Sequence, residues 1–144
     1  MAIEFRFLGT DDPLLEEARE LRFRVLREPL GFSRADVIVE GEDDSMHLAA
    51  VDAGRVVACV MLTPNSPTRG KLRQMAVRPS FQGMGLGRAL VRHLEETLGA
   101  EGFNEIELHA RDHAVGFYEK LGYVCEGDPF VEVGLPHFLM RKRW

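Results

Sequence analysis

Three glycines stand at alternate positions, Gly83, Gly85 and Gly87, within the stretch QMAVRPSFQGMGLGRALVRHL. They lie where an apolar run gives way to a segment whose leucines recur every four residues. A glycine-rich turn between a strand and a helix lets backbone N–H groups approach a bound group, because no Cβ stands in the way. The first N–H groups of the helix have no partner within it, and the helix dipole is positive there. The stretch therefore predicts an anion site suited to a pyrophosphate.

Other interpretations of the glycine turn fit less well. A Walker A loop needs Lys and then Ser or Thr after its last glycine, and here Gly87 precedes Arg88 and an alanine. A Rossmann loop needs G-x-G-x-x-G, but the sixth position is Arg88 counted from Gly83 and Leu90 counted from Gly85. A turn that merely joins a strand to a helix needs only one glycine, and each unused one costs about 0.5–1 kcal/mol.

The elements that must position this turn follow from apolar periodicity and from turn residues. Asp11 or Asp12 is the expected N-cap of the first helix, and Asp112 that of the last one. Strands are expected at 3–8, 46–51, 56–62, 71–77, 104–110, 123–127 and 137–144, with a turn at 52–55, and helices at 11–31, 85–99 and 112–122. An irregular, acidic segment at 32–45 separates the first helix from the second strand. This order predicts an α/β fold in one mixed-sheet domain, residues 1–144.

Composition narrows the class of protein. The net charge is −5 and the pI about 5.5, which argues against a general nucleic-acid binder. The N-terminus does not have the pattern of a signal peptide, and no apolar run has the length of a membrane span. Cys59 and Cys125 lie in apolar, strand-like runs without metal-ligand spacing, so both are expected in the core of a cytoplasmic protein. No metal site is predicted.

Longer stretches of the chain resemble one family. The run from Gln82 to Gly87 matches the Q/R-x-x-G-x-G/A signature of the GCN5-related N-acetyltransferases, the GNAT superfamily. LRQMAVRP is similar to the central strand of that family, and AVGFYEKLGY to its later helix. The closing stretch EVGLPHFLM, at 132–140, resembles the E-x-G-I-P-H-x-x-M of the ElaA/YjcF-like branch. Many members have Asn three residues before the helix alanine, where this chain has Arg111.

The resemblance implies a fold and a cofactor. It implies a mixed sheet in which two central parallel strands, 71–77 and 104–110, splay apart between flanking helices. The acyl-pantetheine arm of acetyl-CoA would lie in the gap and pair with the backbone of Met75, Ala76 and Val77. The pyrophosphate would lie on the glycine turn, whose expected contacts are Gln82, Gly83, Met84, Gly85, Leu86, Gly87 and Arg88. Arg88 is equally well explained as a solvated helix residue.

The resemblance also implies direct acetyl transfer to the primary amine of a small molecule or peptide, without a covalent acyl-enzyme. A backbone N–H near Val77 would polarise the thioester carbonyl. Tyr118, in FYEK, is the expected acid for the leaving thiolate, and the competing interpretation is a packed aromatic. His109 and His137 are the candidate bases, because histidine titrates near neutral pH. Glu132 and His47 are further candidates for the same role.

Two other functions remain open from the sequence. One is a non-catalytic acyl-CoA-binding or sensing module, against which the retained Tyr118 argues. The other is a nucleotide-binding module, which the loop spacing disfavours. The acidic segment Glu40–Asp44 could attract a cationic amine, although a solvated loop explains it as well. The sequence leaves a homodimer open and points to no nucleic-acid or membrane partner.

Overall fold

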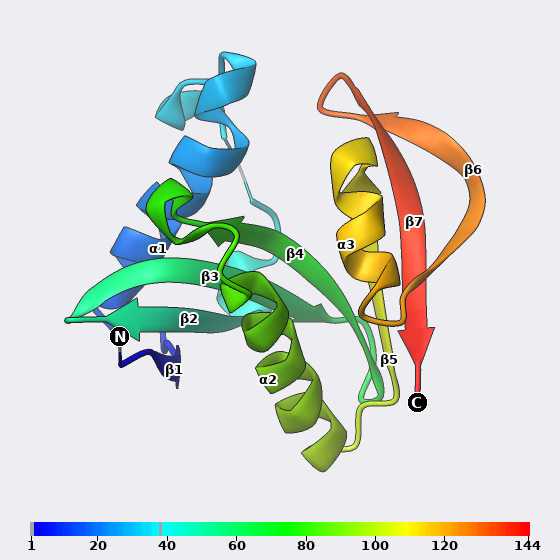
Figure 1. Cartoon of the computed structure of the whole chain (residues 1–144), viewed down its shortest axis with the longest axis horizontal. Helices are drawn as coiled ribbons and strands as arrows, with labels where there is room; N and C mark the ends of the chain where they lie inside the picture. The colour runs from blue at the N-terminus through cyan, green and yellow to red at the C-terminus, as the bar shows by residue number, and fades with distance from the viewer. Residues whose placement is uncertain (1, 38) are drawn as a thin grey trace.

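The computed structural model describes residues 2–37 and 39–144 of the chain. Within them, seven strands form one mixed sheet in the order β1-β2-β3-β4-β5-β7-β6 (Figure 1). The strands are β1 (Glu4–Phe7), β2 (Met46–Asp52), β3 (Arg55–Pro64), β4 (Arg69–Val77), β5 (Glu105–Arg111), β6 (Val124–Glu132) and β7 (Leu135–Arg143). Both the predicted α/β class and the predicted order of elements are confirmed.

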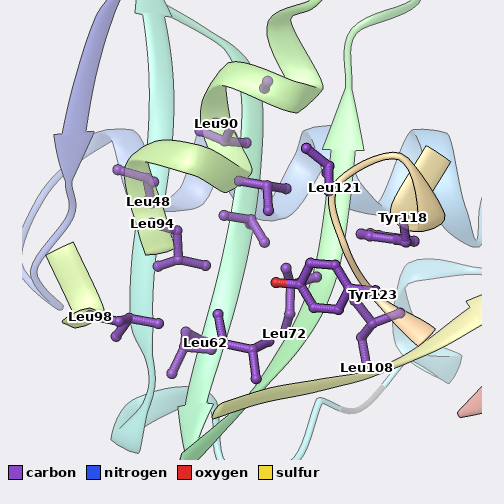
Figure 2. Close-up of a cluster of buried hydrophobic side chains, with 14 of the residues drawn as sticks. Leu48, Leu62, Leu72, Leu90, Leu94, Leu98, Leu108, Tyr118, Leu121 and Tyr123 are labelled. Atoms are coloured by element: carbon purple, nitrogen blue, oxygen red, sulfur yellow. The ribbon is translucent and has the colours of Figure 1, made fainter. Parts of the chain in front are cut away.

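The helices cover both faces of the sheet, so each face has its own apolar core. They are α1 (Leu14–Leu26), α2 (Leu86–Ala100) and the short α3 (Val115–Glu119). The apolar residues of α1 that pack on β2, β3 and β4 are Leu15, Ala18 and Leu21. On the other face, the leucines of α2 cover Leu48, Leu62 and Leu72 (Figure 2). Among the described residues, no helix is both long and apolar enough to cross a membrane.

The two central parallel strands separate partway along their length. β4 pairs with β5 only over Arg69–Leu72 and Glu105–Leu108, and beyond these residues the ribbons diverge (Figure 1). Near this point β4 also changes register against β3, because two residues, Gln74 and Met75, stand opposite one. Gln74 has a φ of +54°, as expected of a β-bulge, which bends a strand locally. The predicted splay is therefore present, and a bulge accompanies it.

The ends of two helices differ from the sequence prediction. The first helix ends at Leu26 rather than near residue 31, and a 3₁₀ turn, η1 (Glu28–Leu30), follows it. Asp12 stabilises its start by accepting a hydrogen bond from the Leu14 amide at 3.0 Å. Asp112 was expected to cap the last helix, but it begins a 3₁₀ turn, η5 (Asp112–Ala114), with no side-chain cap. The α-helical part is consequently only five residues long.

One of the two cysteine predictions is wrong. Cys59 is buried, as expected, and its thiol lies 3.6 Å from the Ala18 carbonyl oxygen beneath α1. Cys125 is exposed. It lies on β6, which forms an edge of the sheet and in which no residue is buried. An apolar run of this length does not distinguish a covered strand from an exposed edge strand.

Candidate active site

The glycine turn uses its three glycines for two different reasons. Gly83 and Gly85 have φ values of +78° and +79°, which L-residues rarely adopt, and a Cβ on either would meet nothing within 4 Å. Gly87 has ordinary helical backbone, but its Cβ would lie 2.9 Å from Met75 Cε and 3.4 Å from Phe117 Cζ. Two glycines therefore shape the turn, and the third lets α2 pack closely on β4 and α3.

The start of α2 offers unpaired backbone donors. Gly85 is its N-cap residue, no side chain caps the helix, and its first turn holds no acidic residue. The first internal bond runs from the Ala89 amide to the Gly85 carbonyl, so the amides of the three preceding residues have no partner within the helix. These donors and the positive end of the helix dipole fit a pyrophosphate.

The end of β4 presents backbone groups to the gap. The Arg78 amide bonds the Val57 carbonyl at 2.8 Å, and amides of alternate residues in an antiparallel strand point the same way. The Ala76 amide therefore points toward β3 and the Val77 amide toward the gap, while Met75 lies within the bulge, where this alternation is interrupted. The Gln82 amide side chain donates to the Val77 carbonyl at 3.0 Å. The Val77 amide thus faces the gap in which an acyl-pantetheine arm would pair, whereas the Val77 carbonyl already accepts a hydrogen bond.

Two neighbouring cavities open beside the separated strands. The glycine-turn cavity has a volume of about 580 Å³ and contains every predicted cofactor-binding residue except Met84, which is exposed. The second cavity, which we call the basic cavity, has a volume of about 410 Å³. Its lining includes the three predicted catalytic residues Tyr118, His109 and His137. Both cavities are lined by Val25, Leu26, Met75, His113, Ala114 and Tyr118. They therefore meet where α1 ends, where β4 bulges and where α3 begins.

Tyr118 lies at this meeting point. It is 7% exposed, and its ring packs edge-on against Phe117 and Tyr123. Figure 2 shows the two tyrosines as neighbours. Its hydroxyl donates to the Met75 Sδ at 3.5 Å, and a thioether sulfur is a weak acceptor. Burial raises the pKa of the phenol, so it stays protonated at neutral pH. The hydroxyl can therefore turn to donate to a stronger acceptor in either cavity.

The basic cavity brings two histidines and a carboxylate together from β5 and the β6–β7 hairpin. His109 Nδ1 lies 3.1 Å from Glu132 Oε1, and since a carboxylate only accepts, the histidine donates. His137 donates from Nδ1 to the Leu135 carbonyl at 2.9 Å, and its Nε2 lies 3.7 Å from Glu132 Oε2. With its Nδ1 protonated, a neutral His109 keeps a lone pair on Nε2.

Glu132 is ionised in this setting. Burial raises the pKa of its carboxyl, but the hydrogen bond from His109, the electrostatic effect of the two imidazole groups and the charge of Lys71 together outweigh burial and hold it below its usual value. The sequence alone placed Glu132 near the hairpin but could not pair it with His109, because the pairing depends on how β5 and β7 align. Arg27, which lines the same cavity from the end of α1, had no sequence signal at all.

The acidic segment does not face the cavities as a free negative surface. Glu42, in the 3₁₀ turn η3 (Glu42–Asp44), accepts from Arg19 Nε at 2.9 Å and also pairs with the buried Arg22. His47 Nε2 donates to the Glu42 backbone carbonyl at 2.9 Å. Glu42 is therefore occupied by two guanidinium groups of α1, and none of residues 40–44 lines either cavity, so the structure does not place this segment where it would attract a cationic amine to the site.

Comparison of the sequence with known proteins identifies the family to which the chain belongs. The sequence model of the Acetyltransferase (GNAT) family matches residues 13–123, from the start of α1 to the strand after α3. The chain belongs to the GNAT family. A Bacillus subtilis protein named a putative acetyltransferase is 32% identical over 137 residues, which cover 93% of this chain and 92% of that one. A second, uncharacterized B. subtilis protein, YyaT, is 31% identical over 136 residues, covering 92% and 91% of the two chains.

Solved structures show the same GNAT fold. Escherichia coli ElaA superposes with a TM-score of 0.83 at 20% identity, covering 99% of this chain and all of ElaA. An aminoglycoside 6′-N-acetyltransferase, solved with coenzyme A, superposes with a TM-score of 0.79 at 22% identity, covering 99% and 97% of the two chains. The resemblance inferred from the glycine signature and the closing hairpin is thus confirmed at the level of the superfamily.

Proposed function

We propose that this protein transfers an acetyl group from acetyl-CoA directly to the primary amine of a small molecule or peptide. The observation that carries the proposal is the junction of the two cavities at Met75 and Tyr118. One cavity is lined by the start of α2, whose first amides have no partner within the helix, and by the end of β4, which does not pair with β5. The other holds a histidine oriented by a carboxylate. A cofactor bound in the first would present its thioester to an amine bound in the second.

Acetyl-CoA would supply the activated acyl group, and the protein residues would position it. The amides of Leu86, Gly87 and Arg88 would bind the pyrophosphate, and the backbone of Met75 and Val77 would bind the pantetheine arm. The Val77 amide, which points into the gap, would donate to the thioester carbonyl oxygen. These contacts hold the acyl carbon at the junction of the cavities, where the acceptor amine can reach it.

Proton transfer would be divided between His109 and Tyr118. The amine must lose a proton to attack, and His109 Nε2 would accept it while Glu132 holds the Nδ1 proton in place. As the new N–C bond forms, the C–S bond breaks and the electron pair leaves with the sulfur. Tyr118 would donate its hydroxyl proton, or a strong hydrogen bond, to that sulfur. Because burial raises the pKa of the phenol, hydrogen-bond donation is the easier of the two.

The test is turnover of acetyl-CoA with a panel of primary amines, followed through release of the free thiol. Amine-dependent thiol release and an acetylated product of the expected mass support the proposal. Binding of acetyl-CoA without acetylation of any amine would instead favour a non-catalytic acyl-CoA-binding module. Neither binding nor turnover would remove acetyl-CoA from the function altogether.

A further inference from the structure

The basic cavity has a charge opposite to that of the whole chain. The protein carries a net charge of −5. The described residues that line this cavity nevertheless include four cations, Arg27, Lys71, Arg73 and Arg111, and a single carboxylate, Glu132. A concave site with an excess of one sign of charge raises the local concentration of ligands of the opposite sign. The cavity is therefore suited to an acceptor that carries negative charge.

Two of the four cations have roles of their own in the structure. Arg73 has hydrogen-bond partners, and Lys71 acts on Glu132 through its charge. Arg73 Nη1 donates to the Glu40 carbonyl at 2.6 Å and to Thr63 Oγ1 at 3.2 Å, which fixes it to the neighbouring loop. Lys71 acts on Glu132, whose pKa it helps to lower. Arg73 is therefore not free to bind a ligand, whereas Lys71 contributes its charge to the field of the cavity.

Arg27 and Arg111 have no comparable partner. Arg27 Nη1 donates to the Leu26 carbonyl at 3.3 Å, and Arg111 Nη2 donates to the same oxygen at 2.8 Å. Among the side chains that the structure describes, neither guanidinium forms an ion pair with a carboxylate. Each guanidinium carries five N–H donors, so one shared carbonyl leaves most of them unused. The end of α1 and the end of β5 thus bring two arginines together around one acceptor.

The environment of the pair disfavours its charge. Burial lowers the pKa of both guanidinium groups, and the charge of Arg111 lowers that of Arg27 further, against a smaller opposing effect of Glu132. An arginine nevertheless remains protonated in a protein, so the two positive charges persist side by side. A bound oxyanion would neutralise them and accept from both guanidinium groups, as carboxylates and phosphates do in bidentate pairs.

We propose that the acceptor is an amine that also carries an oxyanion group, a carboxylate or a phosphate monoester, and that Arg27 and Arg111 bind that group. The inference rests on the proposed acetyl transfer and specifies its substrate class. Leu26, whose carbonyl joins the two arginines, also lines the glycine-turn cavity, so the bound oxyanion lies beside the junction. The amine then lies within the same cavity as Glu132 and His109. Polyamines and basic peptides would meet four like charges there.

The experiment compares matched pairs of amines that differ in the oxyanion. Phenylalanine is paired with phenethylamine, alanine with ethylamine, and phosphoethanolamine with ethanolamine, and kcat/KM is measured through thiol release from acetyl-CoA. We expect the anionic member of at least one pair to be preferred by about tenfold or more, since hydrogen bonds to charged groups contribute about 1.5–3 kcal/mol. The carboxylate and phosphate pairs show which oxyanion the site takes.

Variants assign the preference to the two arginines. Arg27→Gln and Arg111→Gln should each lower kcat/KM for the anionic amine about 10- to 100-fold more than for its neutral partner. Arg92→Gln, the same change at an exposed position of α2 outside both cavities, should leave both values unchanged. If a Gln variant does not fold, Arg27→Lys keeps the charge but loses the planar fork, and should show a smaller selective loss.

The outcomes separate this inference from the function on which it rests. If amines are acetylated but the neutral members are used as well as the anionic ones, the inference is wrong and the proposed function stands. The same holds if the arginine variants lower both members of a pair equally. If acetyl-CoA neither raises the melting temperature nor is turned over with any amine, the proposed function is wrong, and the assignment of an acceptor site falls with it.

Discussion

Two neighbouring buried tyrosines have different hydrogen bonds. Tyr123 donates to Glu95 Oε2 at 2.8 Å, and Lys142 Nζ also binds that carboxylate, at 3.0 Å. Tyr118 has only the Met75 sulfur, and of the two tyrosines it alone lines both cavities. The hydroxyl of Tyr123 therefore contributes to stability, whereas that of Tyr118 is left for another acceptor.

The pair of tyrosines gives a prediction with a built-in control. Tyr118→Phe should keep the fold and the affinity for CoA but lower kcat by about 100- to 10,000-fold, the usual effect of losing a general acid. Tyr123→Phe should leave kcat unchanged and lower the free energy of unfolding by about 1.5–3 kcal/mol, because a charged hydrogen bond is lost. Steady-state kinetics and chemical denaturation measure the two effects. An unchanged kcat in Tyr118→Phe, without a pre-steady-state burst, would make Tyr118 a packed aromatic.

Glu132 should matter to catalysis through His109. In Glu132→Gln the amide can present its NH₂ group to Nδ1, which favours the tautomer with a protonated Nε2 and removes the lone pair that would accept the amine proton. We expect kcat to fall by about 10- to 100-fold, toward the lower range for loss of a general base. Glu126→Gln, on the same strand, removes a carboxylate that binds Arg141 outside both cavities. It should leave kcat unchanged, and equal losses in the two variants would argue against the role of His109.

At the scale of elements, ion pairs attach the turn η3 to α1. Burial raises the pKa of the Glu42 carboxyl, but Arg19 and Arg22 outweigh burial and hold it below its usual value. A carboxyl whose pKa is lower in the folded state stabilises the fold above its unfolded pKa, near 4.3, and loses that effect as the pH falls through the folded value. The attachment of this turn is therefore expected to depend on pH.

Glu42→Gln tests that dependence. At pH 7 the substitution should lower the free energy of unfolding by about 2 kcal/mol, since two guanidinium groups lose a charged acceptor. The difference from the parent protein should shrink as the pH falls below about 4, where the parent carboxyl is itself protonated. Glu96→Gln, at an exposed position of α2, should change stability by less than about 0.5 kcal/mol. A Glu42→Gln difference that is the same at pH 3 and pH 7 would contradict the assignment.

The sequence predicted the elements well where one periodic pattern decided them. The four-residue spacing of leucines located α2, alternation located β1 and β5, and two apolar runs around a glycine turn located β2 and β3. It failed for Cys125, because burial of an edge strand depends on what covers it, and for Asp112, because the chain tightens into a 3₁₀ turn there. The arginine pair could not be predicted either, since Arg111 and the Leu26 carbonyl are 85 positions apart in the chain. Such contacts depend on the packing of whole elements.

At the scale of the molecule, two cores of unequal size hold the splayed strands. α1 covers one face of the sheet beside β4, while α2 covers the other face (Figure 1). Beyond the last paired residue, β4 stays with β3 and β5 stays with β7. The gap is therefore a boundary between two well-paired halves of the sheet, and a ligand that pairs with β4 there would stabilise the whole fold by mass action.

That stabilisation, and its dependence on the glycine turn, can be measured together. At a hundredfold excess over its Kd, CoA should add about 2.7 kcal/mol and raise the Tm by about 5–10 °C for a chain of this size. Gly85→Glu should abolish the shift, because it places a carboxylate beside the free amides at the start of α2. Gly102→Glu is the matched control: its φ is +94°, a Cβ there also meets open space, and it lies just past the opposite end of α2.

Both substitutions should carry a similar backbone strain, about 1–2 kcal/mol for an L-residue in the left-handed region. The Tm without ligand should therefore fall to a similar extent in the two variants, while only Gly102→Glu keeps the parental shift with CoA. Melting curves at several CoA concentrations provide both numbers from one experiment. A full shift in Gly85→Glu would mean that the glycines only shape a turn and that the pyrophosphate binds elsewhere. Loss of the shift in both variants would mean that strain, rather than the added charge, weakens binding.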